Sequence, residues 1–150
     1  MKLVIQRVSE ASVYIEGKVH DHIGNGLLVL LGIHQEDTEE DRAWCIRKLL
    51  DMRIFSDEKG LMNLSLKDVE GDLMVISQFT LYASTKKGNR PSFIVAARPE
   101  QAIPMYEGFL GQCSKELGKQ VHAGIFGADM KVDLINDGPV TIIIDSRQKD

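Results

Sequence analysis

Cysteine is scarce in this chain, and long hydrophobic runs are missing from it. The 150 residues include two cysteines, Cys45 and Cys113, both in segments with helical apolar spacing. We expect reduced packing cysteines, with a reactive thiol or a disulfide bridge as the alternatives. The longest apolar run, residues 27–33, is far shorter than a membrane-spanning helix. The first residues lead directly into a strand pattern without a signal-peptide core. These absences predict a cytoplasmic protein that does not bind membranes.

Positive charge is also in short supply. Lys and Arg number 18 against 22 Asp and Glu, which gives a formal net charge of −4. Proteins that bind nucleic acids broadly need clustered basic residues to neutralise phosphates. The composition therefore disfavours a DNA-binding or general RNA-binding protein, but it allows an enzyme that contacts only one end of an RNA. The local basic cluster is Lys86, Lys87 and Arg90, which could either contact phosphates or simply face solvent.

Common catalytic and metal-binding motifs are absent as well. The chain has no GxSxG elbow, P-loop, HExxH helix or paired CxxC. His20 and His22 share one strand face, a spacing that could begin a metal site, but no third ligand is evident. We therefore expect a solvated hairpin face and no metal or cofactor. His34 and His122 stand alone and are interpreted as structural hydrogen-bonding residues.

Hydrophobic periodicity predicts the secondary structure. Strands are expected at residues 3–8, 12–15, 19–23, 27–33, 72–83, 130–136 and 140–145, with a short strand or loop at 61–66. The run at 27–33 is apolar at both odd and even positions, which predicts a central strand buried on both faces. Thr38 and Asp41 form a capping-box pattern that opens a helix to about residue 52, and Pro99 begins a second helix to about residue 118. Without repeats or linkers, residues 1–150 are expected to form a single domain. The pattern predicts an α+β fold with curved, mostly antiparallel β-sheets.

Two short strings join polar or backbone-special residues to strand-like runs. The first runs from Ser77 to Leu81 and reads SQFTL, and the second runs from Asn136 to Thr141 and reads NDGPVT. Proline lacks the N–H that a central strand needs, and glycine allows backbone geometry that other residues avoid. In a strand, Ser77 and Phe79 would face one side, and Gln78 and Thr80 the other. The residues alone leave open a strand end with satisfied hydroxyls or a nucleophile, for which no general base is evident.

Together these strings resemble the hallmarks of the D-aminoacyl-tRNA deacylases, SQFTL and NxGPVT. Residues 2–8, 88–93 and 124–130 match the same family in order, so the resemblance spans essentially the whole chain. It implies a barrel-like β core flanked by two main helices, in an obligate homodimer. It also implies hydrolysis of the ester in D-aminoacyl-tRNA at the acceptor end of the tRNA, with no metal and no covalent intermediate.

The resemblance further implies roles for the first string and for residues that would surround it. Ser77, Gln78 and Thr80 would line the site, and the backbone N–H of Phe79 or Thr80 would face the developing oxyanion. The ribose 2′-hydroxyl of the tRNA would help to activate water. The terminal adenine would be held by Phe126 and Met130, for which ordinary core packing is the alternative, and the acceptor-end phosphates by Lys86, Lys87 and Arg90.

The second string would carry the selection between D- and L-amino acids. The resemblance implies a cis peptide bond between Gly138 and Pro139, which would reach into the site of the partner subunit. Neighbouring carbonyls would grip the α-ammonium, so that an L side chain meets the Gly138-Pro139 backbone while a D side chain points to open space. Glycyl-tRNA would escape this selection. Arg7 would tether the motif through hydrogen bonds to carbonyls, or would form only a surface salt bridge.

Two other functions remain compatible with these residues. One is a Ser- or Thr-nucleophile esterase that acts on small substrates. The other is an RNA-binding or replication-associated interaction module on the same fold.

Overall fold

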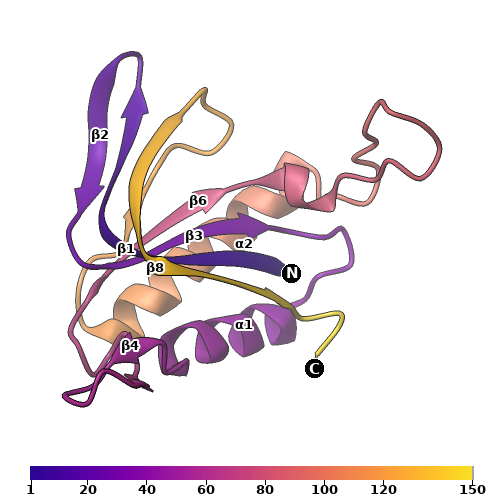
Figure 1. The fold of residues 1–150 in the computed structure, drawn as a ribbon. Coiled ribbons are helices and arrows are strands. Elements are labelled where there is room, and N and C mark those ends of the chain that lie inside the picture. Colours follow the sequence, from indigo (N-terminus) through magenta and orange to yellow (C-terminus); the bar gives the residue numbers. More distant parts are fainter. Residues whose placement is uncertain (150) are drawn as a thin grey trace.

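A curled sheet with two helices packed against it makes up most of the structure, a computed structural model that describes residues 1–149 (Figure 1). The sheet contains β1 (Lys2–Ile15), β2 (Lys18–Ile23), β3 (Gly26–Gly32), β6 (Asp72–Ser77), β7 (His122–Ala123) and β8 (Lys131–Asp145), while β4 (Phe55–Ser56) and β5 (Met62–Leu64) form a small hairpin. The helices are α1 (Glu39–Asp51), α2 (Pro99–Leu117) and the short 3₁₀ helix η1 (Phe79–Tyr82). The expected α+β class, with a barrel-like core and two main helices, is confirmed.

Strand β1 organises the sheet because it pairs with three other strands. Its first half runs antiparallel to β3, its second half runs antiparallel to β2, and its other edge pairs with β8. The order along the sheet is β2-β1-β3-β6-β7. The pairs β3–β6 and β6–β7 are parallel, so the sheet is mixed. A parallel pair needs a long crossover, and α1 lies in the crossover between β3 and β6.

Strand β3 separates two hydrophobic cores, as expected for a strand buried on both faces. Leu27, Val29 and Leu31 pack with α1 and α2 on one side. Leu28 lies on the other side, inside the curl of the sheet, in a cluster with Val8, Ala11, Val13, Ile23, Met74 and Ile76. Because successive strand residues face opposite sides, one apolar run can supply both cores.

Both helices begin as their sequences predict. The Asp41 carboxylate accepts the Thr38 N–H at 2.8 Å, which completes the capping box of α1. Pro99 occupies the first turn of α2, and Gly118 ends that helix with a left-handed φ of 68°. A second proline, Pro104, lies inside α2, and the helix still begins at Pro99, before it. Within residues 1–149, no helix is long and apolar enough to cross a membrane.

The two cysteines are packing residues, as expected. Cys45 and Cys113 are free and completely buried in the core between the sheet and the helices. Burial raises the pKa of each thiol to about 12. Such thiols stay protonated at neutral pH and are therefore poor nucleophiles.

Three predicted strand boundaries were wrong. Residues 3–8 and 12–15 belong to one strand, β1, and residues 130–136 and 140–145 both belong to β8. The predicted strand at 72–83 ends at Ser77, and Phe79–Tyr82 form η1 instead. Its partner β3 ends at Gly32, so no neighbouring strand is left to continue the parallel ladder. The expected alternation of Ser77 and Phe79 against Gln78 and Thr80 is lost with that strand.

Candidate functional site

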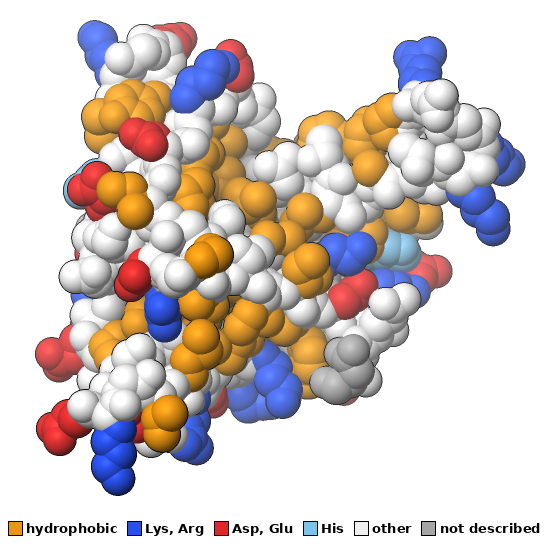
Figure 2. All heavy atoms as spheres, in the orientation of Figure 1, with side chains coloured by type: hydrophobic (Ala, Val, Ile, Leu, Met, Phe, Trp, Pro, Cys, Tyr) orange, Lys and Arg blue, Asp and Glu red, His pale blue; other side chains and the backbone are white. Residues whose placement is uncertain are grey.

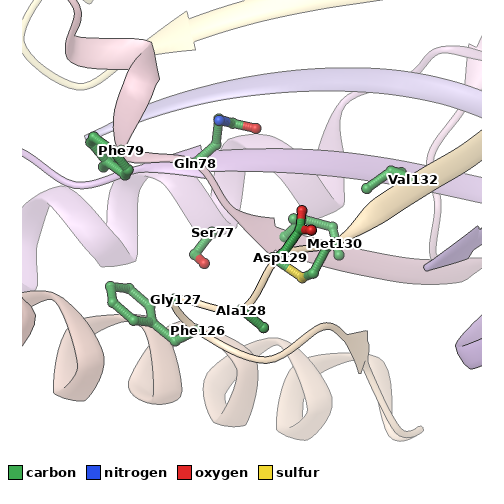
Figure 3. Close-up of a pocket in the computed structure, with 10 residues that line it drawn as sticks. Ser77, Gln78, Phe79, Phe126, Gly127, Ala128, Asp129, Met130 and Val132 are labelled. Carbon is green, nitrogen blue, oxygen red and sulfur yellow. The ribbon is translucent and has the colours of Figure 1, made fainter. Parts of the chain in front are cut away.

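A cavity of about 310 Å³ lies between the end of β6 and the segment that follows β7 (Figure 3). One wall is the start of the SQFTL string, and the other is the segment at residues 124–130, of which residues 126–130 line the cavity. The lining residues are Ile76, Ser77, Gln78, Phe79, Phe126, Gly127, Ala128, Asp129, Met130 and Val132. The structure thus brings together two segments that lie about fifty positions apart in the chain and that were both expected to contribute to the site.

The turn at the end of β6 is fixed by its contact with the end of β3. The Gln78 N–H donates to the Leu31 carbonyl at 2.8 Å, and Gln78 then leaves the strand with φ −147° and ψ 80°. Helix η1 packs directly over Gly32, where an added Cβ would lie 3.0 Å from the Leu81 Cβ and 3.2 Å from the Gln78 carbonyl oxygen. A glycine at the end of β3 therefore allows η1 to approach.

This turn leaves two backbone donors without acceptors. The first hydrogen bond of η1 runs from the Leu81 N–H to the Gln78 carbonyl at 3.2 Å. The preceding N–H groups, of Phe79 and Thr80, are at the start of the helix, where intrahelical acceptors do not exist. Neither donates a hydrogen bond within residues 1–149. Free N–H groups at a helix start can stabilise a negatively charged oxygen.

The two hydroxyl groups of the string lie in different surroundings. Ser77 lines the cavity, and its side chain points toward the segment with Phe126 and Gly127 (Figure 3). Thr80 is exposed and is not a lining residue; its hydroxyl pairs with the side-chain amide of Gln78. In the described part of the chain, no His, Asp or Glu side chain hydrogen-bonds to either hydroxyl. The arrangement therefore supplies backbone donors rather than an activated nucleophile.

The opposite wall combines an aromatic ring with a thioether. Phe126 is half-buried and packs against Tyr106, with ring centroids 6.0 Å apart. The Met130 side chain lies over Gly124, where an added Cβ would be only 2.3 Å from the Met130 sulfur. Phe126 and Met130 therefore also take part in packing, but both present surface to the cavity. A flat apolar face and a polarisable sulfur suit a planar aromatic ligand.

The basic residues lie in a separate cavity on the far side of η1. The loop between η1 and α2 extends from the body of the protein (Figure 1), and Figure 2 shows Lys and Arg side chains on it. Lys86, Lys87 and Arg90 line a cavity of about 320 Å³ together with Tyr82, Ser84, Ser92, Ile94 and Val95. None of the three lines the cavity at Ser77. They form a local positive surface next to the candidate site, on a chain with net negative charge.

The Gly138–Pro139 peptide bond is cis, as expected, and both residues are exposed. Arg7 holds this segment: its Nε donates to the Asp137 carbonyl at 2.9 Å, and its Nη1 donates to the Ile54 carbonyl at 2.7 Å. Arg7 Nε also lies 3.8 Å from Asp137 Oδ2, so Arg7 both donates to a carbonyl of this segment and forms an ion pair with it. Neither Gly138 nor Pro139 lines the cavity at Ser77 in the single chain.

The histidine pair on the first hairpin does not form part of a larger ligand cluster. His20 is exposed, and His22 is exposed with its Nδ1 2.7 Å from the Ser12 hydroxyl. Within residues 1–149, no three His, Cys, Asp or Glu side chains gather as a metal site would require.

Sequence analysis did not assign five of the lining residues to the site: Ile76, Gly127, Ala128, Asp129 and Val132. Asp129 and Val132 line the cavity beside Met130, and Gly124 admits the Met130 side chain. Gly124 could have been found, since a glycine next to an apolar segment often marks a close approach. Asp129 lies in the family-like block 124–130, which could have pointed to it, whereas Val132 carries no sequence signal and only the fold places it at the cavity.

Comparison with known proteins gives consistent matches along the chain. The family model described as D-Tyr-tRNA(Tyr) deacylase matches residues 4–145. Relatives named D-aminoacyl-tRNA deacylase include one from Christiangramia forsetii, 62% identical over 149 residues and 99% of both chains. Another, from Flavobacterium johnsoniae, is 59% identical over 150 residues and 100% of both chains.

Two solved structures share the fold. One is described as c-Myc DNA unwinding element binding protein, with a TM-score of 0.90, 43% identity, and coverage of 97% of this chain and 98% of that chain. The other is described as a probable eukaryotic D-amino acid tRNA deacylase, with a TM-score of 0.84 and 17% identity over 95% of this chain and 97% of that chain. At that identity, the second likeness concerns the fold alone.

The contact between Gly124 and Met130 gives a prediction about the cavity wall. Gly124→Ala should displace the Met130 side chain, because the new Cβ would lie only 2.3 Å from its sulfur. The ¹³C and ¹H shifts of the Met130 methyl group, measured by NMR, should change. Gly111→Ala is the matched control, since an added Cβ there meets nothing within 4 Å. An unchanged Met130 methyl signal in Gly124→Ala would contradict the packing described for this wall.

Proposed function

Because the chain belongs to the D-Tyr-tRNA(Tyr) deacylase family, we propose that it hydrolyses the ester between a D-amino acid and the 3′-terminal ribose of tRNA. The products are the free D-amino acid and tRNA. The observation that carries the proposal is the cavity in which the end of β6, with its free backbone donors, faces Phe126 and Met130. The action takes place in the cytoplasm, where charged tRNA is used.

The proposed chemistry needs positioning and oxyanion stabilisation rather than a side-chain nucleophile. Water attacks the ester carbonyl carbon, and the N–H of Phe79 or Thr80 donates to the oxygen that becomes negative. The neighbouring ribose 2′-hydroxyl helps to take the proton from water. Collapse of the tetrahedral intermediate expels the 3′-oxygen of the ribose, which recovers a proton. Ser77 and Gln78 orient the aminoacyl group at the cavity.

The substrate is held at two further places. The terminal adenine stacks on Phe126 and contacts the Met130 thioether, as single-stranded RNA bases do on aromatic side chains. Lys86, Lys87 and Arg90 neutralise phosphates of the acceptor end. The cavity lined by these basic residues is separate from the cavity at Ser77. This arrangement suits a tRNA acceptor end that lies across η1, with its phosphates at the basic cavity and its aminoacyl end at Ser77.

Selection of the D-amino acid is proposed to come from Gly138 and Pro139 of a second copy of the chain. Two observations support a role outside their own subunit. The segment is exposed, and Arg7 holds it in place through a hydrogen bond to the Asp137 carbonyl. Once the α-ammonium and the ester are held, the Gly138-Pro139 backbone blocks the position of an L side chain and leaves the D position open. The active form is therefore a homodimer.

Two rival functions are separated by one set of assays. A Ser- or Thr-nucleophile esterase would be inactivated by a hydroxyl-reactive inhibitor and would also cleave small esters. A nucleic-acid interaction module, which the name of one structural neighbour would suggest, would bind nucleic acid without releasing amino acid. Incubation with D-Tyr-tRNA and L-Tyr-tRNA, with and without inhibitor, tests all three. Inhibitor-insensitive release of D-tyrosine alone is the expected result.

The hydroxyl groups of the string should be dispensable for the chemical step. Ser77→Ala and Thr80→Ala should each keep kcat within about tenfold of the wild type. A hydroxyl that took part in proton transfer would cost roughly 10²–10⁴-fold when removed, and neither hydroxyl has that role in the proposed reaction. Single-turnover deacylation of D-Tyr-tRNA measures this. Complete loss of activity in a folded Thr80→Ala variant, or an acyl-Thr80 adduct in the mass spectrum, would show that Thr80 is the nucleophile.

The exclusion of L side chains should leave glycine as an exception. D-Tyr-tRNA and D-Ala-tRNA should be cleaved at comparable rates, glycyl-tRNA appreciably, and L-Ala-tRNA hardly at all. A clash with backbone can exceed the ~1–3 kcal/mol that one methylene is worth in a hydrophobic pocket, and glycine has no side chain to clash. Deacylation rates at equal substrate concentrations test this. Equal rates for L-Ala-tRNA and D-Ala-tRNA would rule out selection by exclusion.

The basic loop should contribute to binding rather than to stability. Replacing Lys86, Lys87 and Arg90 together by Ala should raise KM for D-Tyr-tRNA and flatten its dependence on salt, because fewer phosphates are neutralised. The melting temperature should hardly change, since all three side chains are exposed. A triple Ala variant of Lys18, Lys59 and Lys115, exposed lysines elsewhere, is the control of equal charge. Equal KM and salt dependence in the two variants would mean that the loop only faces solvent.

A further inference from the structure

One carboxylate joins two strands that lie at opposite ends of the sheet order. β2 and β7 are the first and last strands in the order β2-β1-β3-β6-β7. Asp21 of β2 nevertheless contacts β7: its Oδ1 lies 2.7 Å from Nδ1 of His122, and its Oδ2 accepts the Ala123 N–H at 3.1 Å. A side chain therefore closes the curl of the sheet where the two end strands approach each other.

This contact is a charge-assisted one. Burial acts to raise the pKa of Asp21, but hydrogen bonds from His122 and from the N–H groups of Ala123 and His22 outweigh it and lower the pKa below its ordinary value. The ionised carboxylate only accepts hydrogen bonds, so Nδ1 of His122 carries the hydrogen. The side chains of Asp21 and His122 are 25% and 24% exposed, which partly shields the pair from water.

The contact lies immediately before the wall that carries Phe126 and Met130. Strand β7 has only two residues, His122 and Ala123, which pair with Met74 and Val75 of β6. The next residue, Gly124, receives the Met130 side chain. With so short a ladder on one side of β7, the Asp21 carboxylate supplies the hydrogen bonds on the other side. The start of the wall is therefore fixed between β6 and Asp21.

We propose that Asp21, acting through His122 and Ala123, is a positioning residue that holds the wall at residues 124–130 at the distance from β6 that the substrate's terminal nucleoside requires. The assignment of a nucleoside to this cavity rests on the proposed function. Neither Asp21 nor His122 lines the cavity, so both act only through the wall.

A neighbouring carboxylate provides a matched control. Asp72, at the start of β6, accepts from Lys119 at 2.8 Å and from the Gly24 N–H at 3.1 Å. The hydrogen bond from Lys119 is the main reason that the pKa of Asp72 is lowered. Asp72 thus contacts the residue that follows β2 and a residue shortly before β7, again through its carboxylate. It makes no hydrogen bond to β7 itself.

The test compares Asp21→Ala, His122→Ala, His122→Asn and Asp72→Asn, with Asp21→Asn as the substitute if Asp21→Ala does not fold. Asp21→Ala and His122→Ala should raise KM for D-Tyr-tRNA by about 3- to 30-fold with kcat little changed, because both residues act on the wall and not on the reacting atoms. Amides of residues 124–130 should exchange hydrogen for deuterium faster. His122→Asn should restore near wild-type KM, because the Asn Nδ2 can donate in place of the His Nδ1. Asp72→Asn should lower the melting temperature without raising KM.

Unchanged KM and unchanged amide exchange in folded Asp21→Ala would overturn the proposal. So would a lower melting temperature and kcat at constant KM, which is the result of a purely structural role. If the wild-type protein does not hydrolyse D-Tyr-tRNA, the proposed function fails, and the exchange rates at residues 124–130 then decide the positioning role by themselves.

Discussion

The pairing of β1 with β8 is the constraint on which the rest of the molecule depends. Gln6 pairs with Thr141 and Val8 pairs with Asn136, so the four residues 137–140 of β8 lie opposite the single residue Arg7. The surplus residues must leave the ladder, and they carry Gly138 and Pro139 to the surface. Arg7, whose side chain is only 11% exposed, holds this part of β8 by donating to the carbonyls of Asp137 and Ile54. A register mismatch between two long strands thus produces a fixed, exposed backbone segment.

The cavity depends on a second property of the strands, namely where they stop. β3 and β6 end together, at Gly32 and Ser77. With no ladder left to join, the chain turns into η1 over the glycine, and this turn frees the N–H groups at the start of the helix. The opposite wall begins where β7 ends, after only two residues of pairing. The site therefore lies at an edge of the sheet, where β3, β6 and β7 end and backbone groups beyond their ends are left unpaired.

Much of this architecture could be predicted from the sequence, because periodicity reports burial. The run at 27–33 predicted a strand with two buried faces, and the Thr38–Asp41 and Pro99 patterns predicted where the helices begin. Strand ends were predicted less well. The apolar residues Phe79 and Leu81 continue the pattern of β6, and only the end of its partner β3 shows why the strand stops at Ser77. The parallel pairs, and the contact between Asp21 and His122 about a hundred positions apart, depend on tertiary structure that no local pattern records.

The same reasoning explains why a site of this kind can be read in part from short motifs. In the proposed reaction, the groups that matter most are backbone groups: N–H donors at the start of η1 and the exposed segment of β8. A backbone group has no side-chain identity, so the sequence records it only through the residues that permit its geometry, such as Gly32 beneath η1 and Gly138, whose φ is 142°. Such a reaction does not require a general base beside the Ser77 or Thr80 hydroxyl, and none is evident in the sequence. A catalytic site made of backbone is specified by where strands end and how they are registered, and substitutions that shift those ends should affect it more than the loss of any one hydroxyl.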